Sequence, residues 1–335
     1  MEKAAWKGIW VIAEQIEGNL NSVSFELLGK AKQMKEQLQI AEPVTAVLLG
    51  SGVADLAQEL GAYGAEEVIV LEHEALAIYE NETYAAVLSD LIKERKPEII
   101  LMGATAIGQD LAPMLGALLN TAVAAHCVDL RINEEGQFVS VVPAFGGKVL
   151  GDILCPTHRP QMATVKPGIL GKAVSQSEAK YQVSTYDVEK ALAQVSGRVK
   201  ALGVYRKEPE GIPLEKAEVI VAGGWGMGSK ENWHYLDELA ALLGGAVGCT
   251  RPAVDEKWAD GEHQMIGTSG KTVRPKVYLG TAISGATHHL CGMKDAGLVI
   301  SINKDPDAPI FACSDVCIVA DAGKFLPRLI ERIKH

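Results

Sequence analysis

At 335 residues the chain is longer than one average domain, and 48% apolar with 22% charged residues is enough core-forming material for two folded domains. The formal net charge of −10, with the basic residues scattered, argues against a nucleic-acid partner. The apolar run GIWVIA near the start is too short for a signal-peptide core or a membrane span, so we expect no membrane insertion and a cytoplasmic location. Six cysteines without a pairing framework are expected to be reduced packing residues, and no metal site is expected.

The first half alternates short β-branched runs with amphipathic stretches, a pattern typical of βαβ units and a parallel sheet. Buried strands are expected in GIWVIAE, TAVLLG, EVIVLE and EIILMGA. Helical spacing of apolar residues predicts helices over 22–38, 53–64, 81–96 and 108–120.

Between residues 122 and 167 the pattern changes to strand-turn-strand, with turns expected at 133–137 and 145–148. We expect antiparallel strands here that extend the first sheet. The stretch 170–213 is polar and lacks strong periodicity, which predicts a linker with some local helix.

A second α/β pattern follows. Strands are expected over 218–224, 246–250, 276–284, 298–303 and 317–321, and helices over 230–244, 285–296 and 324–334. The predicted fold is α/β with two domains, each a mostly parallel doubly wound sheet, the second of which binds a dinucleotide. The predicted boundaries are 1–190 for an N-terminal domain that docks a partner, 191–213 for the linker and 214–335 for the ligand-binding domain.

Several strand ends in the second half carry residues suited to a ligand. The glycine-rich turn 223–226 lacks the G-x-G-x-x-G spacing, so a plain turn is about as good an interpretation. The strand-to-helix turn at Ser284 and Gly285 would let backbone N–H groups approach a pyrophosphate, although an ordinary turn explains it equally well. The loop 265–271 supplies two glycines and two hydroxyls.

Other strand ends carry Asn303, followed by Lys304 and Asp305, and Asp321, which alone would each indicate only a helix cap. Two cations, Arg251 and His289, follow strands of the same sheet and could face one crevice. For Arg251 the alternative is a surface ion pair, and for His289 a helix-face residue bonded to a carbonyl. No nucleophile, base and orienting acid form a triad, so bond-making catalysis is not expected.

Taken together, TRPAVD, IGTSGK, KVYLGTAISGATHHLCGMKDAG and VISINKDPDAPIF resemble the alpha subunit of electron-transferring flavoprotein. The resemblance spans the C-terminal domain and extends less sharply into the N-terminal one through VSFELLGKA, MGATAIGQDLAP and RPQMATVKP. It implies FAD in an extended groove of the second domain and a beta subunit as heterodimer partner. The N-terminal domain would form the docking surface, with QDLAPMLGALLN as one candidate contact.

The resemblance also implies site residues. Arg251 would lie over the flavin ring, the Ser269 hydroxyl would face N5, and His289 would face the pyrimidine carbonyl. All three would tune the flavin potential, with Arg251 and a protonated or donating His289 favouring the anionic reduced ring. The full set implied for FAD binding is Trp225, Thr250, Arg251, Ile266, Gly267, Thr268, Ser269, Ser284, Gly285, Ala286, Thr287, His288, His289, Asn303, Asp321 and Ala322.

Two positions depart from the family pattern. Trp225 stands where the family has arginine within GGRG, so a charged contact is lost or replaced by stacking. CSDVC at 313–317 replaces an acidic-tyrosine-glycine pattern, and no physical reason for that change is evident.

The function implied is an electron carrier between NADH or a dehydrogenase and an acyl-CoA dehydrogenase, or quinone- or ferredoxin-side acceptors. The segment RPQMATVKP resembles the anaerobic branch whose complexes bifurcate electrons from NADH. Two alternatives stay open: a nucleotide- or NAD-dependent enzyme on a similar domain, and a regulatory or structural subunit that binds a nucleotide such as AMP, or nothing, without a redox flavin.

Overall fold

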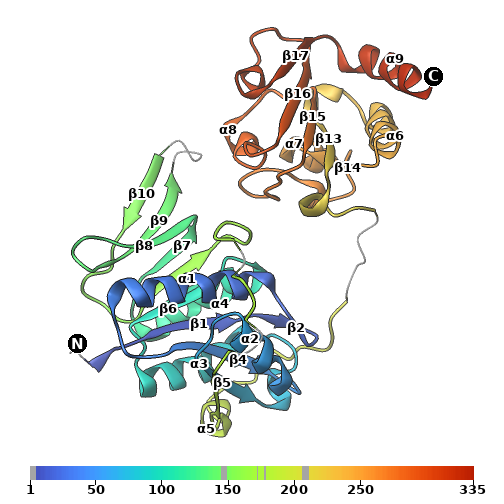
Figure 1. Cartoon of the computed structure of the whole chain (residues 1–335). Helices are drawn as coiled ribbons and strands as arrows, with labels where there is room; N and C mark the ends of the chain where they lie inside the picture. Colours follow the sequence, from blue (N-terminus) through green and yellow to red (C-terminus); the bar gives the residue numbers. More distant parts are fainter. Residues whose placement is uncertain (1–4, 145–148, 172, 177–178, 206–210) are drawn as a thin grey trace. The chain divides into compact units, whose positions relative to one another are not determined.

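The computed structural model describes residues 5–144, 149–171, 173–176, 179–205 and 211–335. The chain divides into two compact units, one running to Tyr205 and the other occupying the rest of the C-terminal part (Figure 1). Among the described residues, none of the helices combines the length and apolarity that crossing a bilayer requires.

The N-terminal unit is built on a seven-stranded sheet in the order β12-β5-β4-β1-β6-β11-β7, with every neighbouring pair parallel. Its strands are β1 (Ile9–Ala13), β4 (Val44–Gly50), β5 (Glu67–Glu72), β6 (Ile99–Gly103), β7 (Val123–Cys127), β11 (Gln161–Val165) and β12 (Gln182–Thr185). The four strands predicted in the first half are confirmed. Strands β1, β4 and β6 are buried along their whole length because both faces of a parallel sheet are covered.

Helices cover both faces of this sheet. The helices α1 (Ser22–Leu38) and α2 (Ala57–Ala62) pack on one apolar cluster, and α3 (Asn81–Arg95), α4 (Ala106–Leu119) and the short α5 (Glu189–Leu192) pack on the other. The helix predicted over 53–64 is a 3₁₀ turn, η2 (Ala54–Leu56), that leads into α2. A small hairpin of β2 (Gln15–Ile16) and β3 (Asn19–Leu20) follows β1, and a further 3₁₀ turn is η3 (Glu74–Leu76).

The expectation that antiparallel strands extend the first sheet is wrong. The strands β8 (Asp129–Ile132), β9 (Phe138–Ala144) and β10 (Val149–Ile153) form their own antiparallel sheet (Figure 1). Only β7 and β11 join the main sheet, and β11 inserts in parallel between β6 and β7. All five residues of β11 are buried there, which favours insertion into the apolar layer. The turn at 133–137 is confirmed by the Asn133 N to Gln137 O bond of 3.0 Å, while the turn expected at 145–148 lies outside the described residues.

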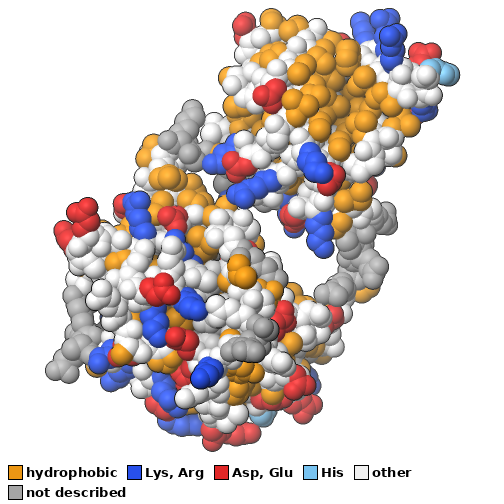
Figure 2. All heavy atoms as spheres, in the orientation of Figure 1, with side chains coloured by type: hydrophobic (Ala, Val, Ile, Leu, Met, Phe, Trp, Pro, Cys, Tyr) orange, Lys and Arg blue, Asp and Glu red, His pale blue; other side chains and the backbone are white. Residues whose placement is uncertain are grey.

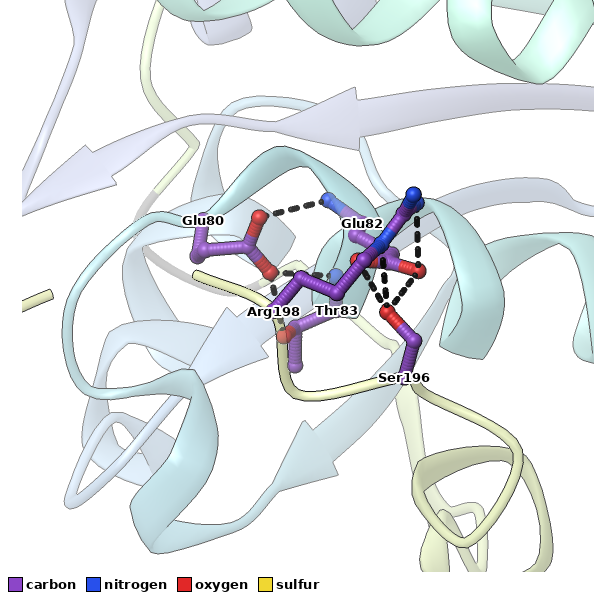
Figure 3. A network of polar contacts seen from close by, with 5 residues as sticks. All are labelled: Glu80, Glu82, Thr83, Ser196 and Arg198. Carbon is purple, nitrogen blue, oxygen red and sulfur yellow. Dashed lines mark hydrogen bonds and ion pairs between the residues drawn. The ribbon is translucent and has the colours of Figure 1, made fainter. Parts of the chain in front are cut away.

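Part of the segment predicted as a linker is ordered structure. Strand β12 pairs with β5 at the sheet edge, and α5 packs against the apolar cluster under α3. Glu80 caps α3 by accepting from the backbone N of Thr83 at 2.7 Å, and Ser196 and Arg198 contact Glu82 one residue before Thr83 (Figure 3). The chain is therefore bound to the N-terminal unit as far as Arg198.

The C-terminal unit has a five-stranded parallel sheet in the order β14-β13-β15-β16-β17. The strands are β13 (Val219–Gly223), β14 (Ala246–Cys249), β15 (Val277–Thr281), β16 (Leu298–Asn303) and β17 (Val316–Val319), so all five predicted strands are confirmed. One face packs against α6 (His234–Leu242), α7 (Arg251–Asp255) and α9 (Ala322–Lys334). The other carries α8 (Thr287–Leu290), and the 3₁₀ turns are η5 (Leu214–Lys216), η6 (Trp225–Met227), η7 (Lys230–Trp233), η8 (Glu262–Gln264) and η9 (Pro309–Cys313).

The helix expected over 285–296 is much shorter than predicted. Only Thr287–Leu290 is helical, and turns follow it. Gly285 precedes the helix with a φ of +92°, which favours glycine. One helical turn has little macrodipole, so the argument for a pyrophosphate at a helix start is weaker here than the sequence indicated.

Both units also expose apolar side chains. Figure 2 shows hydrophobic side chains gathered over one side of the C-terminal unit. Val316 and Val319 of β17 are exposed in this unit, and in the N-terminal unit β10 exposes Val149 and Leu150. Exposed strand residues of this kind often mark protein contacts.

Candidate functional site

A cavity of about 610 Å³ lies at the carboxyl ends of the strands of the C-terminal unit. In the sheet β13 lies between β14 and β15. The chain leaves β13 toward β14 on one side and leaves β15 toward β16 on the other, so the direction of the connections reverses between β13 and β15. Open α/β sheets bind ligands at such a switch point. The volume lies in the range of pockets for small molecules and cofactors.

Residues from the ends of all five strands line this cavity. They are Gly224, Trp225, Gly226, Thr250, Arg251, Pro252, Met265, Ile266, Gly267, Thr268, Ser269, Gly270, Ala282, Ile283, Ser284, Ala286, His288, His289, Asn303, Lys304, Asp305, Ala308, Pro309, Asp321 and Ala322. Every residue that the sequence predicted for the site is in this set except Gly285 and Thr287, which lie beside it in the chain.

The loop 265–271 is held against the end of β14. The Ile266 N donates to Cys249 O at 2.9 Å, and Lys271 N closes the loop on Met265 O at 2.7 Å. The same loop is bonded to α8, because Thr268 N donates to His288 O at 2.8 Å. Ser269, which is exposed, is thereby fixed on the same side of the cavity as Arg251.

His289 is buried and both of its ring nitrogens have protein partners. Nδ1 lies 3.0 Å from the Ile266 carbonyl oxygen and therefore donates to it, while Nε2 lies 2.6 Å from the Tyr278 hydroxyl and accepts from it. Burial lowers the pKa of His289 to about 4. Two roles were open for His289, a protonated ring and a ring that donates a hydrogen bond; burial and the two protein partners hold the ring neutral at pH 7, which disfavours the protonated one.

Tyr278, which donates the hydrogen bond to His289, is a site residue that the sequence did not indicate. It lies on β15, is fully buried, and burial raises its pKa well above the usual range. A tyrosine within an apolar strand gives no signal for a polar role, because its hydroxyl partner is eleven residues further along the chain.

Arg251 begins α7 and forms an ion pair with Asp255 one turn later, with Nε 3.0 Å from Oδ1. Both side chains are more than half exposed, so the pair itself is a weak contributor to stability. The contact uses one of the five N–H donors of the guanidinium. The surface ion pair that was the alternative to a ligand-binding role for Arg251 is therefore present. The remaining guanidinium N–H donors are still available at the cavity.

Thr250 supplies a different signal. Its hydroxyl oxygen is buried and has no hydrogen-bond partner among the described residues, although the residue lines the cavity. A buried hydroxyl without a partner is costly. Because the residue lines the cavity, its hydroxyl is a candidate contact for a polar ligand atom.

The far end of the cavity is formed by the ends of β15, β16 and β17. Asn303 Nδ2 donates to Ile283 O at 2.8 Å and its Oδ1 accepts from Asp305 N at 2.9 Å, which holds two strand ends together. Asp321 caps α9 by accepting from Lys324 N at 3.2 Å. Both side chains shape the cavity wall and still have acceptor capacity for a ligand.

No group of three His, Cys, Asp or Glu side chains in the described part of the chain is arranged to hold a metal ion. The six cysteines form no disulfide among the described residues, and Cys313 and Cys317 are exposed.

Comparisons with known proteins agree with this geometry. Residues 9–191 match the family model described as Electron transfer flavoprotein domain, and residues 213–294 match the Electron transfer flavoprotein FAD-binding domain. The chain is 44% identical to Electron transfer flavoprotein subunit alpha of Clostridium acetobutylicum, over 100% of this chain and 99% of that protein.

Two further relatives carry more specific names. The chain is 37% identical to Acryloyl-CoA reductase electron transfer subunit beta of Anaerotignum propionicum, over 99% of this chain and 96% of that protein. It is also 37% identical to Lactate dehydrogenase (NAD(+),ferredoxin) subunit LctC of Acetobacterium woodii, over 100% of this chain and 78% of that protein.

Proposed function

Because the chain belongs to the family of electron transfer flavoprotein alpha subunits, we propose that it binds FAD in the cavity at the β13/β15 switch point and carries electrons for a partner dehydrogenase. The observation that carries the proposal is the cavity itself. It joins the ends of five adjacent parallel strands, a span of about 19 Å at roughly 4.8 Å per strand, which suits an extended dinucleotide.

The flavin ring is best accommodated at the β14 end. Arg251, Ser269 and Thr250 all follow β14 and line the cavity, so this end offers a cation and polar groups to a ring whose charge changes. The cofactor supplies the redox chemistry, and the chain supplies binding and electrostatics. Arg251 stabilises negative charge, Ser269 donates or accepts one hydrogen bond, and neutral His289 fixes the loop that presents Ser269.

The residues at the other end suit the pyrophosphate and adenosine. Lys304 lines the cavity there beside the Ser284 segment, and Asn303, Asp321 and Ala322 form the wall. The proposed contacts to the cofactor also include Gly267, Thr268, Ala286 and His288, which line the cavity. Gly285 and Thr287 lie next to these residues in the chain and fix the course of the backbone.

The assembly that we propose is a heterodimer with a beta subunit. Exposed apolar residues support it: Leu118 of α4 is 41% exposed, and Leu150 of β10 is 61% exposed. Leu111, Leu115 and Leu119 of α4 are buried against the sheet, whereas Pro113 and Ala117 are exposed beside Leu118, so the outer face of the predicted contact helix is available. The relatives named as parts of an acryloyl-CoA reductase and of a lactate dehydrogenase (NAD(+),ferredoxin) support a dehydrogenase-type redox partner, for which we propose an acyl-CoA dehydrogenase. We further propose that the complex works in the cytoplasm and that electron bifurcation is its most specific form.

Replacing Arg251 with alanine is expected to lower the one-electron potentials of the flavin by tens of millivolts, since each tenfold loss of affinity for the anionic form corresponds to about 59 mV. Asp255→Asn is the matched control, because it removes the opposing charge and should shift the potentials upward. Both shifts should shrink at high salt because the pair is exposed. The measurement is an anaerobic redox titration of the alpha-beta complex. If the potentials of Arg251→Ala are unchanged, the flavin ring does not lie at the β14 end of the cavity.

Thr250→Val is expected to weaken FAD binding about tenfold while leaving the flavin-free protein as stable as the wild type or more so, because it removes an unpartnered buried hydroxyl. The control is Thr281→Val. The Thr281 hydroxyl donates to Ala222 O at 2.8 Å, so its loss should cost about 1 kcal/mol with or without ligand. Urea unfolding and FAD titration measure the two effects, and equal destabilisation of both flavin-free variants would contradict the assignment.

The first experiment is the visible spectrum of the purified alpha-beta complex. A flavin spectrum whose cofactor is released as FAD supports the proposal. A colourless complex that takes up no added FAD would favour the alternative of a subunit that binds a nucleotide, or nothing, which the loss of a cation at Trp225 keeps open.

A further inference from the structure

Trp225 differs from the other four tryptophans of the chain. Trp10 and Trp233 are buried, and Trp6 and Trp258 pack against the apolar clusters of their units. Trp225 is 62% exposed and lines the cavity. It is the only tryptophan, tyrosine or phenylalanine among the described residues that line it. An indole left this exposed at a ligand cavity is a natural contact for a planar apolar surface.

The backbone around Trp225 is fixed by hydrogen bonds to the end of a neighbouring strand. Gly224 N donates to Thr281 O at 2.9 Å and Gly226 N donates to Ala282 O at 3.2 Å, so both neighbours of the tryptophan are bonded to the end of β15. Met227 is buried, and its carbonyl accepts from Asn232 Nδ2 at 2.7 Å. The indole therefore stands on a rigid turn, and little ordering of the backbone is needed when a ligand binds.

The turn that carries Trp225 also has a defined place along the cavity. η6 lies against the start of α9, which follows Asp321 and Ala322 at the β17 side. Arg251, the first residue of α7, and Ser269, on the loop 265–271, belong to the β14 side. By strand order η6 follows β13, the neighbour of β14, and its contact with α9 brings Trp225 within reach of the β17 side as well.

We propose that the indole of Trp225 stacks on the adenine ring of the bound dinucleotide, and so supplies by ring contact the affinity that a cation would supply by charge. The proposal rests on the proposed FAD site. Arg251 and Lys304 are the only lysine or arginine residues among the described residues that line the cavity, and Asp305 and Asp321 offset them. Stacking is suited to such a site because it needs no charge and accepts the π-face of any base.

The test measures the affinity of three ligands for the flavin-free complex of the full alpha chain with its beta subunit. FAD and ADP contain adenine, and FMN does not. Trp225→Ala is expected to weaken FAD and ADP binding each by on the order of tenfold to hundredfold and to leave FMN binding unchanged. Trp225→Phe should restore most of the loss. Binding of either adenine ligand should quench tryptophan fluorescence in the wild type and much less in Trp225→Phe.

Tyr205→Ala is the matched control, since Tyr205 is an aromatic residue that is 92% exposed and does not line the cavity, and it should change no affinity. The proposal is overturned if Trp225→Ala weakens FMN as much as ADP, which would put the indole on the flavin, or if it changes no affinity at all. The two proposals fail separately. Quenching by ADP without any FAD binding would keep the adenine contact and reject the flavoprotein site, whereas FAD binding that ignores Trp225 would do the reverse.

Discussion

Gly285→Ala is expected to destabilise the C-terminal unit by roughly 2–5 kcal/mol and to abolish flavin retention. Gly285 has a φ of +92°, and a Cβ built there would lie 2.2 Å from the Ile310 nitrogen and 2.6 Å from the Ile310 Cα. Both atoms are backbone, so no side-chain rotation relieves the clash. Left-handed strain costs about 1–2 kcal/mol and forced overpacking typically 1–3 kcal/mol more, against a total stability of about 5–15 kcal/mol.

The clash would also act directly on the cavity. Ile310 N donates to Ser284 O at 3.1 Å, and this bond holds the Ser284 segment to η9, which follows β16. Separating the two would move Ser284 and Pro309, which both line the cavity. Loss of flavin should therefore exceed what the fall in stability alone explains.

Gly244→Ala is the control that separates strain from collision. Gly244 has a φ of +62° and nothing lies within 4 Å of an added Cβ. It should lose only the conformational cost of about 1 kcal/mol and keep its flavin. Urea unfolding and the flavin absorbance of purified complexes measure both. A Gly285→Ala variant as stable and as yellow as Gly244→Ala would show that the Ser284–Ile310 contact is not required.

Acidification from pH 7 to pH 4 is expected to remove up to about 3 kcal/mol of stability through His289 alone. The pKa of His289 is lowered from 6.5 to about 4 in the folded protein, because burial disfavours the charged ring. The unfolded chain therefore binds the proton first. This contribution is fully present above pH 6.5 and is lost as the pH falls toward 4, at about 1.4 kcal/mol for each pH unit between the pKa of the unfolded chain and that of the folded protein.

The groups around the imidazole do not change this sign. Tyr278 and Cys249 are the titratable groups of the neighbouring strands, and burial raises the pKa of both, that of Cys249 to about 12. Both stay neutral between pH 4 and pH 7. The Ile266 carbonyl, from the loop, is uncharged and raises the His289 pKa only as a hydrogen-bond acceptor.

The measurement is urea unfolding at a series of pH values for the wild type and for His289→Gln, whose difference isolates this residue from the acidic groups. The slope of the wild type between pH 6.5 and pH 4 should be steeper than that of the variant. A direct NMR titration of His289 gives the second readout. Tyr278→Phe removes a hydrogen bond to the neutral ring and should raise the measured pKa. A wild-type His289 that titrates near 6.5 would contradict the buried, neutral state.

The sequence by itself determined most strands of the two parallel sheets and placed the candidate ligand residues at their carboxyl ends. Buried β-branched runs such as VTAVLLG and VIVAG form strands wherever a parallel sheet is covered on both faces, and loops after such strands meet at one edge. That is why residues as distant as Arg251 and Asp321 were expected at one site and line one cavity. The local pattern of apolar residues is sufficient to predict a strand when the strand packs only against another apolar layer.

Only the tertiary structure decided what depends on distant partners. The polar segment QVST becomes edge strand β12 because β5 offers an open hydrogen-bonding edge, and β11 enters the main sheet between strands formed about 40 and 60 residues earlier in the chain. Burial and the hydrogen bond from Tyr278 keep His289 neutral. The nearby carboxylate of Asp255 partly offsets the positive charge of Arg251. Desolvation and long-range pairing are properties of the folded surroundings, so no local pattern of residues records them.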